Sequence, residues 1–151
     1  MPKMMTEVAL AYIFDAQGRV LIAKRPQNKH MGGYWEFPGG KLDLGESPAQ
    51  AIEREIFEEL AICVTATNVL SRFALAVTPE LAFFPVICQW LSGDIVLLEH
   101  DKYSFVAPEH LANSNFNSKL NSKLNSNFNL APADVVAARK LINFLHSKPA
   151  K

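Results

Sequence analysis

The chain has few cysteines, no excess of charge of either sign and no long apolar run. Its two cysteines, Cys63 and Cys88, lack metal-ligand spacing. We expect them to be reduced core residues, with a single disulfide left open. A formal net charge of zero gives no positive field to attract nucleic acid or a membrane surface. No segment approaches the roughly 18 apolar residues of a membrane span, and the apolar run at residues 8–14 is too short for a signal peptide. We therefore expect a cytoplasmic protein that binds neither nucleic acid directly nor membranes.

Length and composition favour one globular domain over residues 1–151. The chain is 49% hydrophobic and 20% charged, which is ordinary for a domain with one sizeable core. Runs of apolar and β-branched residues predict strands at 6–14, 19–24, 34–37, 65–77, 81–91 and 103–106. Helices are expected from Pro48, as one turn at 108–111, and near the C-terminus. Alternating strands with two main helices predict an α/β sandwich.

Four local features of this pattern carry their own predictions. Residues 78–80 are expected to form a turn, and Pro85 indicates an edge strand or a bulge. Residues 95–98 are expected to be extended. Residues 113–129 are rich in Asn and Ser, with Asn-Ser-Lys-Leu repeated in tandem, and we interpret them as an insertion within the domain. A tolerated surface loop and a loop that binds a partner or covers substrate both remain open.

The helix expected from Pro48 has a clear start and one apolar side. Ser47 is a good N-cap, Pro48 suits the first helical position, and Gln50 completes a capping box. Four apolar residues at helical spacing form one stripe: Ala49, Ile52, Ile56 and Leu60. The segment therefore predicts a helix that packs one face on the core.

Three glutamates of the same helix form a cluster. Glu55, Glu58 and Glu59 are three and four residues apart, so we expect their carboxylates to converge opposite the apolar stripe. Such carboxylates repel one another by a few tenths of a kcal/mol per pair. A hard divalent cation such as Mg²⁺, which binds oxygen ligands, would offset that repulsion. A merely solvated acidic helix face is the alternative.

The surrounding segment has a longer fixed spacing. Gly40 is followed after five residues by Glu46, and after seven more by Arg-Glu-Ile-Phe-Glu-Glu-Leu-Ala-Ile at 54–62. This resembles the Nudix box, G-x5-E-x7-R-E-U-x-E-E-x-G-U, at every defined position except the last glycine, which is Ala61 here. A glycine at a helix end usually supplies a left-handed residue. Ala61 in that conformation should cost about 1 kcal/mol, and we expect the loop to stay in place.

The Nudix resemblance implies a fold, a cofactor and a set of ligands. The implied fold is an α/β/α sandwich with a mixed central sheet, and the implied cofactor is Mg²⁺, or Mn²⁺ in its place. The implied metal ligands are the Gly39 carbonyl and the carboxylates of Glu55, Glu58, Glu59 and Glu99.

The resemblance also implies catalytic roles for Arg54, Glu55, Glu58 and Glu99. Glu55 would be a metal ligand or the group that activates water, and Glu99 a ligand or base from another loop. Taken alone, Glu99 is an ordinary surface glutamate. Arg54 would orient a carboxylate such as Glu58, while a structural ion pair with Glu46 is the alternative.

A closer similarity extends to segments outside the box. Residues 24–26, 30–41 and 132–134 look like the MutT branch, the oxidised-guanine nucleotide diphosphatases. The likeness covers most of residues 6–145, apart from the Asn/Ser-rich tract. The implied substrate-binding residues are Arg25, His30, Glu36, Phe37, Lys41 and Asp134.

Asp134 is the implied reader of the base. An ionised aspartate only accepts hydrogen bonds, so it suits the N7–H of 8-oxoguanine and disfavours the bare N7 acceptor of guanine. An ordinary helix N-cap is the alternative for Asp134. Phe37 matches a base-pocket position but suits the core equally well, and His30 also fits a structural role in its loop. Lys41 is placed to reach a phosphate.

The implied activity is Mg²⁺-dependent hydrolysis of 8-oxo-dGTP to 8-oxo-dGMP and pyrophosphate, which sanitises the nucleotide pool. Another nucleoside triphosphate or nucleoside diphosphate derivative as substrate is one alternative. A catalytically dead nucleotide-binding module is another, although Arg54, Glu55, Glu58 and Glu59 are all present. We expect a small-molecule nucleotide as partner and a monomer or weak dimer.

Overall fold

The computed structural model describes residues 5–112 and 128–147. The elements in chain order are β1 Thr6–Ile13, β2 Val20–Lys24, β3 Trp35–Glu36, β4 Gly39–Lys41, α1 Pro48–Leu60, β5 Cys63–Val69, β6 Phe73–Leu75, β7 Thr78–Ser92, β8 Lys102–Val106, α2 Pro108–Ala112 and α3 Pro132–Ser147. The predicted insertion at residues 113–129 lies outside the described residues except for 128 and 129.

Two sheets form the framework. The larger has the order β4-β1-β7-β5, and β6 also pairs with β7. Strands β1 and β7 are parallel, while β4, β5 and β6 run antiparallel to their neighbours, so the sheet is mixed. The smaller sheet, β3-β2-β8, is antiparallel throughout. The predicted strand at 34–37 and the one at 103–106 both belong to it.

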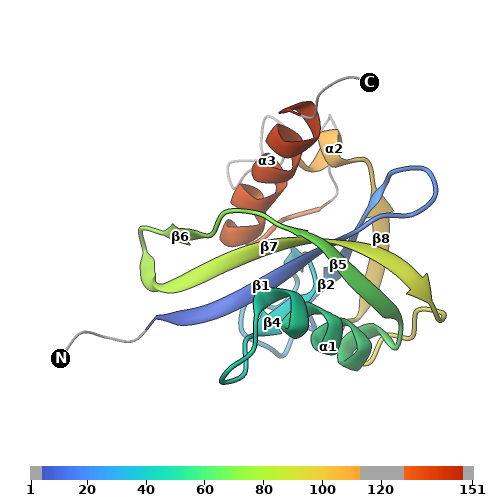
Figure 1. The fold of residues 1–151 in the computed structure, drawn as a ribbon, viewed down its shortest axis with the longest axis horizontal. Helices are drawn as coiled ribbons and strands as arrows, with labels where there is room; N and C mark the ends of the chain where they lie inside the picture. The colour runs from blue at the N-terminus through green and yellow to red at the C-terminus, as the bar shows by residue number, and fades with distance from the viewer. Residues whose placement is uncertain (1–4, 113–127, 148–151) are drawn as a thin grey trace.

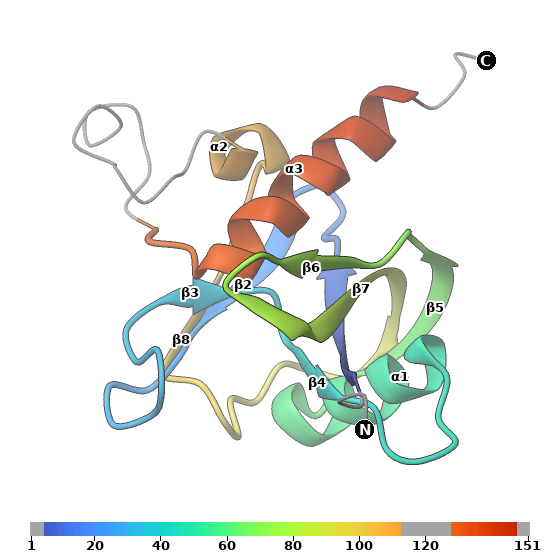
Figure 2. The same cartoon turned by 90° about the vertical axis from the view of Figure 1, so that its left-hand side faces the viewer.

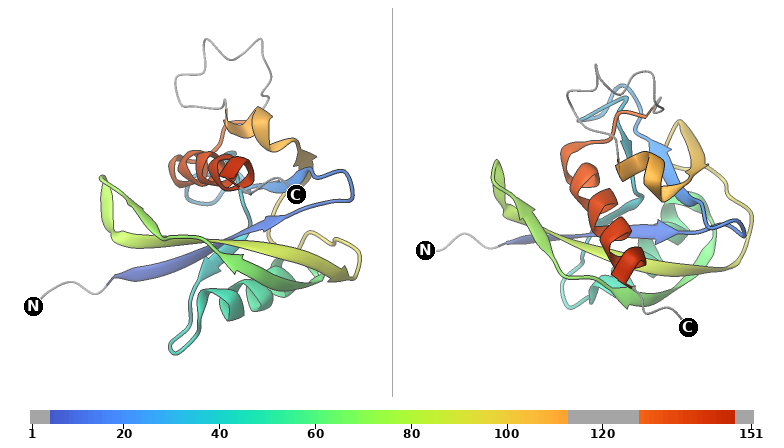
Figure 3. Two further views of the ribbon diagram at one scale, coloured as in Figure 1. Left: turned by 45° about the horizontal axis from the view of Figure 1, so that its top comes forward. Right: turned by 90° about the horizontal axis from the view of Figure 1, so that it is seen from above.

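Helices cover both faces of the larger sheet. Helix α1 lies on one side of it, and α2 and α3 lie on the other (Figure 1). The turned views show the same layers, with the sheet between α1 and α3 (Figures 2 and 3). The predicted α/β/α sandwich with a mixed central sheet is therefore confirmed.

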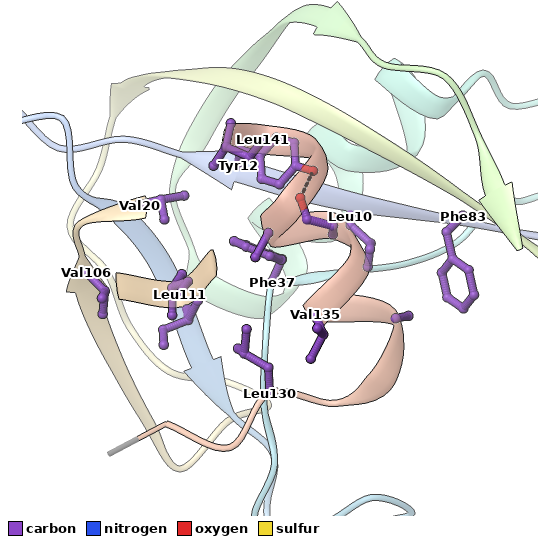
Figure 4. Close-up of a cluster of buried hydrophobic side chains, with 14 residues drawn as sticks. Leu10, Tyr12, Val20, Phe37, Phe83, Val106, Leu111, Leu130, Val135 and Leu141 are labelled. Atoms are coloured by element: carbon purple, nitrogen blue, oxygen red, sulfur yellow. Dashed lines mark hydrogen bonds between the residues drawn. The ribbon is translucent and has the colours of Figure 1, made fainter. Parts of the chain in front are cut away.

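The core on the α3 side is built around Tyr12 and Phe37. Their rings make an edge-to-face contact with centroids 5.0 Å apart. The Tyr12 hydroxyl, which is fully buried, donates a hydrogen bond of 2.6 Å to the Ala137 carbonyl of α3 (Figure 4). Burial raises the pKa of Tyr12, so this hydroxyl remains a donor. The bond fixes α3 over β1.

Helix α1 begins as the sequence predicts. The Ser47 hydroxyl accepts from the Gln50 N–H at 3.1 Å, and the Gln50 side chain accepts from the Ser47 N–H at 2.9 Å. Ile52, Ile56 and Leu60 are fully buried against the sheet.

One expectation for α1 is wrong. Glu59 is only 7% exposed and does not lie opposite the apolar stripe. It follows Ile52 by seven residues and Ile56 by three, so helical geometry places it beside them. Ala51 is fully buried, whereas Ala49 is half-buried.

The end of α1 is closed by the chain itself. Ala61 has φ 60° and ψ 24°, the left-handed conformation expected for this position, and its N–H donates to the Phe57 carbonyl at 3.0 Å. The Val96 N–H bonds the Leu60 carbonyl at 2.9 Å and the Leu98 N–H bonds the Glu59 carbonyl at 3.0 Å. These bonds satisfy carbonyls that a helix end otherwise leaves without partners.

Several other expectations need correction. The turn lies at residues 76–77, because Leu75 of β6 pairs directly with Thr78 of β7. Pro85 lies in an interior strand, where β5 pairing ends and β6 pairing begins, and its carbonyl accepts from the Leu70 N–H.

Both cysteines are free, but Cys63 is exposed at the start of β5 and is not a core residue. Within residues 5–112 and 128–147, no helix has the length and apolar character to cross a membrane.

Candidate active site

A cavity of about 300 Å³, here called the acid cavity, opens beside α1 and β4. All five predicted metal ligands line it: Gly39, Glu55, Glu58, Glu59 and Glu99. Arg25, Lys29, Glu36 and His100 are also part of its wall. Side chains from four separate parts of the chain therefore converge on one concave, acidic place.

Glu59 is the deepest of the glutamates. Its carboxyl lies against the Glu55 side chain and the Gly39 backbone. Burial raises its pKa to about 10, and the neighbouring charges of Glu55 and Glu36 add to that shift. The ionised form of Glu59 is therefore disfavoured in the cluster as it stands, and a bound cation would stabilise that form.

Arg54 ties the carboxylates together. Its guanidinium makes a forked pair with Glu46 at 2.7 and 2.9 Å, and contacts Glu55 at 2.7 Å and Glu58 at 3.0 Å. It also donates to the Lys41 carbonyl at 3.1 Å. Hydrogen bonding from Arg54 lowers the pKa of Glu46 to about 2. Because one oxygen each of Glu55 and Glu58 is held this way, Arg54 is placed to orient them, and Glu46 orients Arg54.

The double glycine is required by close contacts on both sides. A Cβ on Gly39, whose φ is 153°, would collide with the Ala9 carbonyl of β1. A Cβ on Gly40 would collide with the Glu55 carboxylate. Glycine here lets the backbone of β4 lie directly against the acidic cluster.

The donor set suits a hard divalent cation. Within the described ranges, no three His, Cys, Asp or Glu side chains are already gathered as a metal-binding group. Mg²⁺ does not need such a cage, since it usually keeps several waters and binds through one or two carboxylates plus substrate phosphates. Glu55, Glu58 and Glu59, with the Gly39 carbonyl, supply oxygens of that kind around one cavity.

Glu99 lies at the exposed part of the acid cavity. Its carboxylate accepts from the Lys29 ammonium at 3.2 Å, and both side chains are about half exposed. The loop before β8 therefore carries Glu99 to the same cavity as the glutamates of α1. Its role as ligand or base remains a prediction.

A second cavity of about 510 Å³, here called the apolar cavity, adjoins the first. Apolar side chains provide much of its wall, among them Val8, Leu75, Val77, Leu81 and Phe83. Five of the six predicted substrate-binding residues also line it: Arg25, His30, Glu36, Lys41 and Asp134. Arg25 and Glu36 line both cavities and form an ion pair of 3.2 Å, so this pair stands where the cavities meet.

Asp134 is held at the wall of the apolar cavity by the backbone between β3 and β4. Its Oδ1 accepts from the Phe37 N–H at 2.8 Å, and only 4% of the residue is exposed. Burial raises the pKa of Asp134 well above its usual value, and the negative charge of Glu36 adds a smaller contribution. Asp134 is the third residue of α3, so the N-cap alternative is wrong.

The structure decides the placement of Phe37 and adds His100 to the site. The Phe37 side chain is 1% exposed and packs in the core, so of its two predicted placements the core is the one observed. His100, which the sequence analysis did not single out, is buried at the acid cavity with Nε2 2.9 Å from Glu36. Its position after Glu99 was the only signal in the sequence.

The chain belongs to the NUDIX family, because residues 4–124 match the NUDIX domain. An 8-oxo-dGTP diphosphatase of Proteus vulgaris is 47% identical over 74 residues, which span 49% of this chain and 66% of that protein. A CTP pyrophosphohydrolase of Escherichia coli K12 is 28% identical over 97% of this chain and 98% of its own length. The solved structure of the E. coli ORF135 protein has a TM-score of 0.73 at 27% identity and full coverage of both chains.

These matches confirm the predicted family and fold, and make the chain a Nudix hydrolase. The two named relatives have different substrates, an oxidised purine nucleotide in one and a pyrimidine nucleotide in the other. The substrate of this chain therefore has to be argued from its own cavities.

Proposed function

We propose that this protein is a Mg²⁺-dependent nucleoside triphosphate pyrophosphohydrolase that cleaves 8-oxo-dGTP to 8-oxo-dGMP and pyrophosphate. The observation that carries the proposal is the meeting of the acid cavity and the apolar cavity at Arg25 and Glu36. A nucleotide has the same two halves, a polyphosphate that needs cations and a base that suits apolar walls. One substrate can therefore occupy both cavities at once.

Five residues of the acid cavity have a direct role in this proposal. Glu55, Glu58 and Glu59 hold the metal with the Gly39 carbonyl. When bound, Mg²⁺ neutralises phosphate oxygens and makes a coordinated water a better nucleophile. Glu99 would act as the general base that accepts the proton of the attacking water. Glu55 is the alternative for this role.

The cationic side chains assist in orientation and charge. Arg54 keeps Glu55 and Glu58 in fixed directions through its contacts at 2.7 and 3.0 Å. Arg25 lines both cavities, and Lys41 lines the apolar cavity directly after the double glycine, so each offers positive charge to the phosphates.

Base selection rests on Asp134. The Phe37 N–H bonds one carboxylate oxygen, Oδ1, and we assign the second oxygen to accept from the base. The N7–H of 8-oxoguanine is such a donor, whereas unoxidised guanine presents an acceptor there. A donating base favours the ionised form of Asp134 in spite of burial, because it hydrogen-bonds the charged state.

A second candidate substrate is CTP. The E. coli CTP pyrophosphohydrolase aligns over nearly the whole chain, unlike the Proteus protein. The exocyclic amino group of cytosine also donates to a carboxylate, so Asp134 suits this base as well. The smaller pyrimidine would leave more of the apolar cavity unfilled.

A nucleotide panel tests the proposal. Pyrophosphate release is measured on 8-oxo-dGTP, dGTP, CTP and dCTP, with Mg²⁺ and with EDTA. We expect the highest kcat/KM on 8-oxo-dGTP and no release in EDTA. Equal rates on dGTP and 8-oxo-dGTP would refute the selectivity for the oxidised base, and a CTP preference would establish the second candidate.

A variant pair tests the metal assignment in the same assay. Glu59→Gln keeps the size of the side chain but removes a ligand charge, so we expect at least about a 100-fold loss of kcat. Glu109→Gln changes an exposed glutamate of α2 and should leave the rate unchanged. Full activity of Glu59→Gln would show that the metal is held elsewhere.

A further inference from the structure

His100 lies in the loop between β7 and β8, and the backbone on both sides of it is fixed. The Leu98 N–H bonds the Glu59 carbonyl of α1 at 3.0 Å, and the Asp101 N–H bonds the Lys24 carbonyl of β2 at 3.0 Å. The His100 side chain is 4% exposed and forms part of the acid cavity wall. Its imidazole therefore has a defined place between α1 and the smaller sheet.

The ring stands between two carboxylates from different elements. Nε2 lies 2.9 Å from Oε2 of Glu36 on β3 and 3.9 Å from Oε1 of Glu59 on α1. An ionised carboxylate only accepts, so Nε2 carries the hydrogen and donates it to Glu36. Nδ1 is buried and has no hydrogen-bond partner among the described residues. Nε2 is thus the ring nitrogen through which His100 acts.

Glu36 is also held from its other side. Arg25 donates to both Glu36 oxygens, at 3.2 and 3.5 Å, and is itself fixed by a bond of 2.8 Å to the His30 carbonyl. Glu36 lines both cavities, so its orientation shapes the place where they meet. Without the contact to His100, the carboxylate would be restrained by Arg25 alone.

We infer that His100 is a positioning residue, which holds the Glu36 carboxylate at the junction of the cavities and keeps it out of the cation site beside Glu59. This inference rests on the proposed function, since it requires a divalent cation near Glu59. The role needs an N–H donor at the position of Nε2 and does not require a change in protonation. Partners that orient a metal site typically change metal affinity 10–100-fold when removed.

Three substitutions separate this role from simple packing. His100→Ala removes the donor, and we expect the dissociation constant for Mn²⁺, without nucleotide, to rise at least about 10-fold. A glutamine amide can reach the place of Nε2, so His100→Gln should stay within about threefold of the unsubstituted protein. An asparagine amide falls short of it, so His100→Asn should behave as His100→Ala does.

Mn²⁺ binding is measured by electron paramagnetic resonance, with urea unfolding of the metal-free protein alongside. His110→Ala, an exposed histidine of α2, is the matched control and should bind Mn²⁺ normally. Since His100 acts through Glu36, His100→Ala should have no further effect on Mn²⁺ affinity in a Glu36→Gln background. If His100→Ala does not fold, the comparison of His100→Gln with His100→Asn decides the question.

Two results would overturn the inference while leaving the proposed function in place. Unchanged Mn²⁺ affinity in His100→Ala and His100→Asn would show that His100 does not act on the cation site. Equal weakening in His100→Gln and His100→Asn, in proportion to lost stability, would show a packing role only. If the unsubstituted protein neither binds Mn²⁺ nor releases pyrophosphate, the proposed function itself fails and the inference fails with it.

Discussion

Replacing Ala61 by glycine should stabilise the fold. Ala61 ends α1 with φ 60° and ψ 24°, a left-handed conformation that costs an L-residue about 1–2 kcal/mol. Glycine removes that cost but gains about 0.4–1 kcal/mol of conformational freedom in the unfolded chain. The middle values of these two ranges give a net gain of about 0.8 kcal/mol for Ala61→Gly. The backbone bond to the Phe57 carbonyl is unaffected, because it involves only the Ala61 N–H.

Urea unfolding measures this gain directly. The midpoint should rise with an unchanged m-value, and the melting temperature should rise by about 1–4 °C for a chain of this length. Ala51→Gly is the matched control, since Ala51 is a buried, right-handed residue of the same helix. It should lose about 1 kcal/mol or more. A neutral or destabilising Ala61→Gly would refute the left-handed helix end.

Two further predictions concern the acidic cluster. Gly40→Ala places a Cβ against the Glu55 carboxylate, so kcat should fall about 10–100-fold while urea unfolding shows a stable fold; an unchanged kcat would contradict the close contact. The pKa of Glu46 falls from 4.5 to about 2 beside Arg54, so its pairing stabilises the fold above pH 4.5 and is lost as pH falls towards 2. Glu46→Gln should therefore lose less stability over that pH range, and an identical acid profile in urea unfolding would count against the pairing.

Helix α1 was predictable because its determinants are local. The capping box of Ser47 and Gln50 and the buried spacing of Ile52, Ile56 and Leu60 all lie within one segment, and the structure confirms them. The hairpin turn was misplaced because residues 78–80 have turn-forming composition. Pairing across the sheet overrides that preference, since β7 begins at Thr78 and pairs with β1, β5 and β6.

The site shows the same division between local and long-range information. The spacing of the α1 glutamates is visible in the sequence, and the burial of Glu59 follows from its spacing to Ile56. His100 is different, because its contacts join a loop, β3 and α1. Phe37 has two separate functions, a side chain in the core and an N–H on Asp134, and composition alone does not separate them.

The central claim is that the glutamates of α1 and the Gly39 carbonyl hold a divalent cation in the acid cavity. Anomalous diffraction from crystals grown with Mn²⁺ locates such an ion directly. We expect a peak bonded to oxygens of Glu55 or Glu58, of Glu59 and of Gly39. The absence of a peak in that cavity at saturating Mn²⁺, or a peak bound by other residues, would contradict the claim.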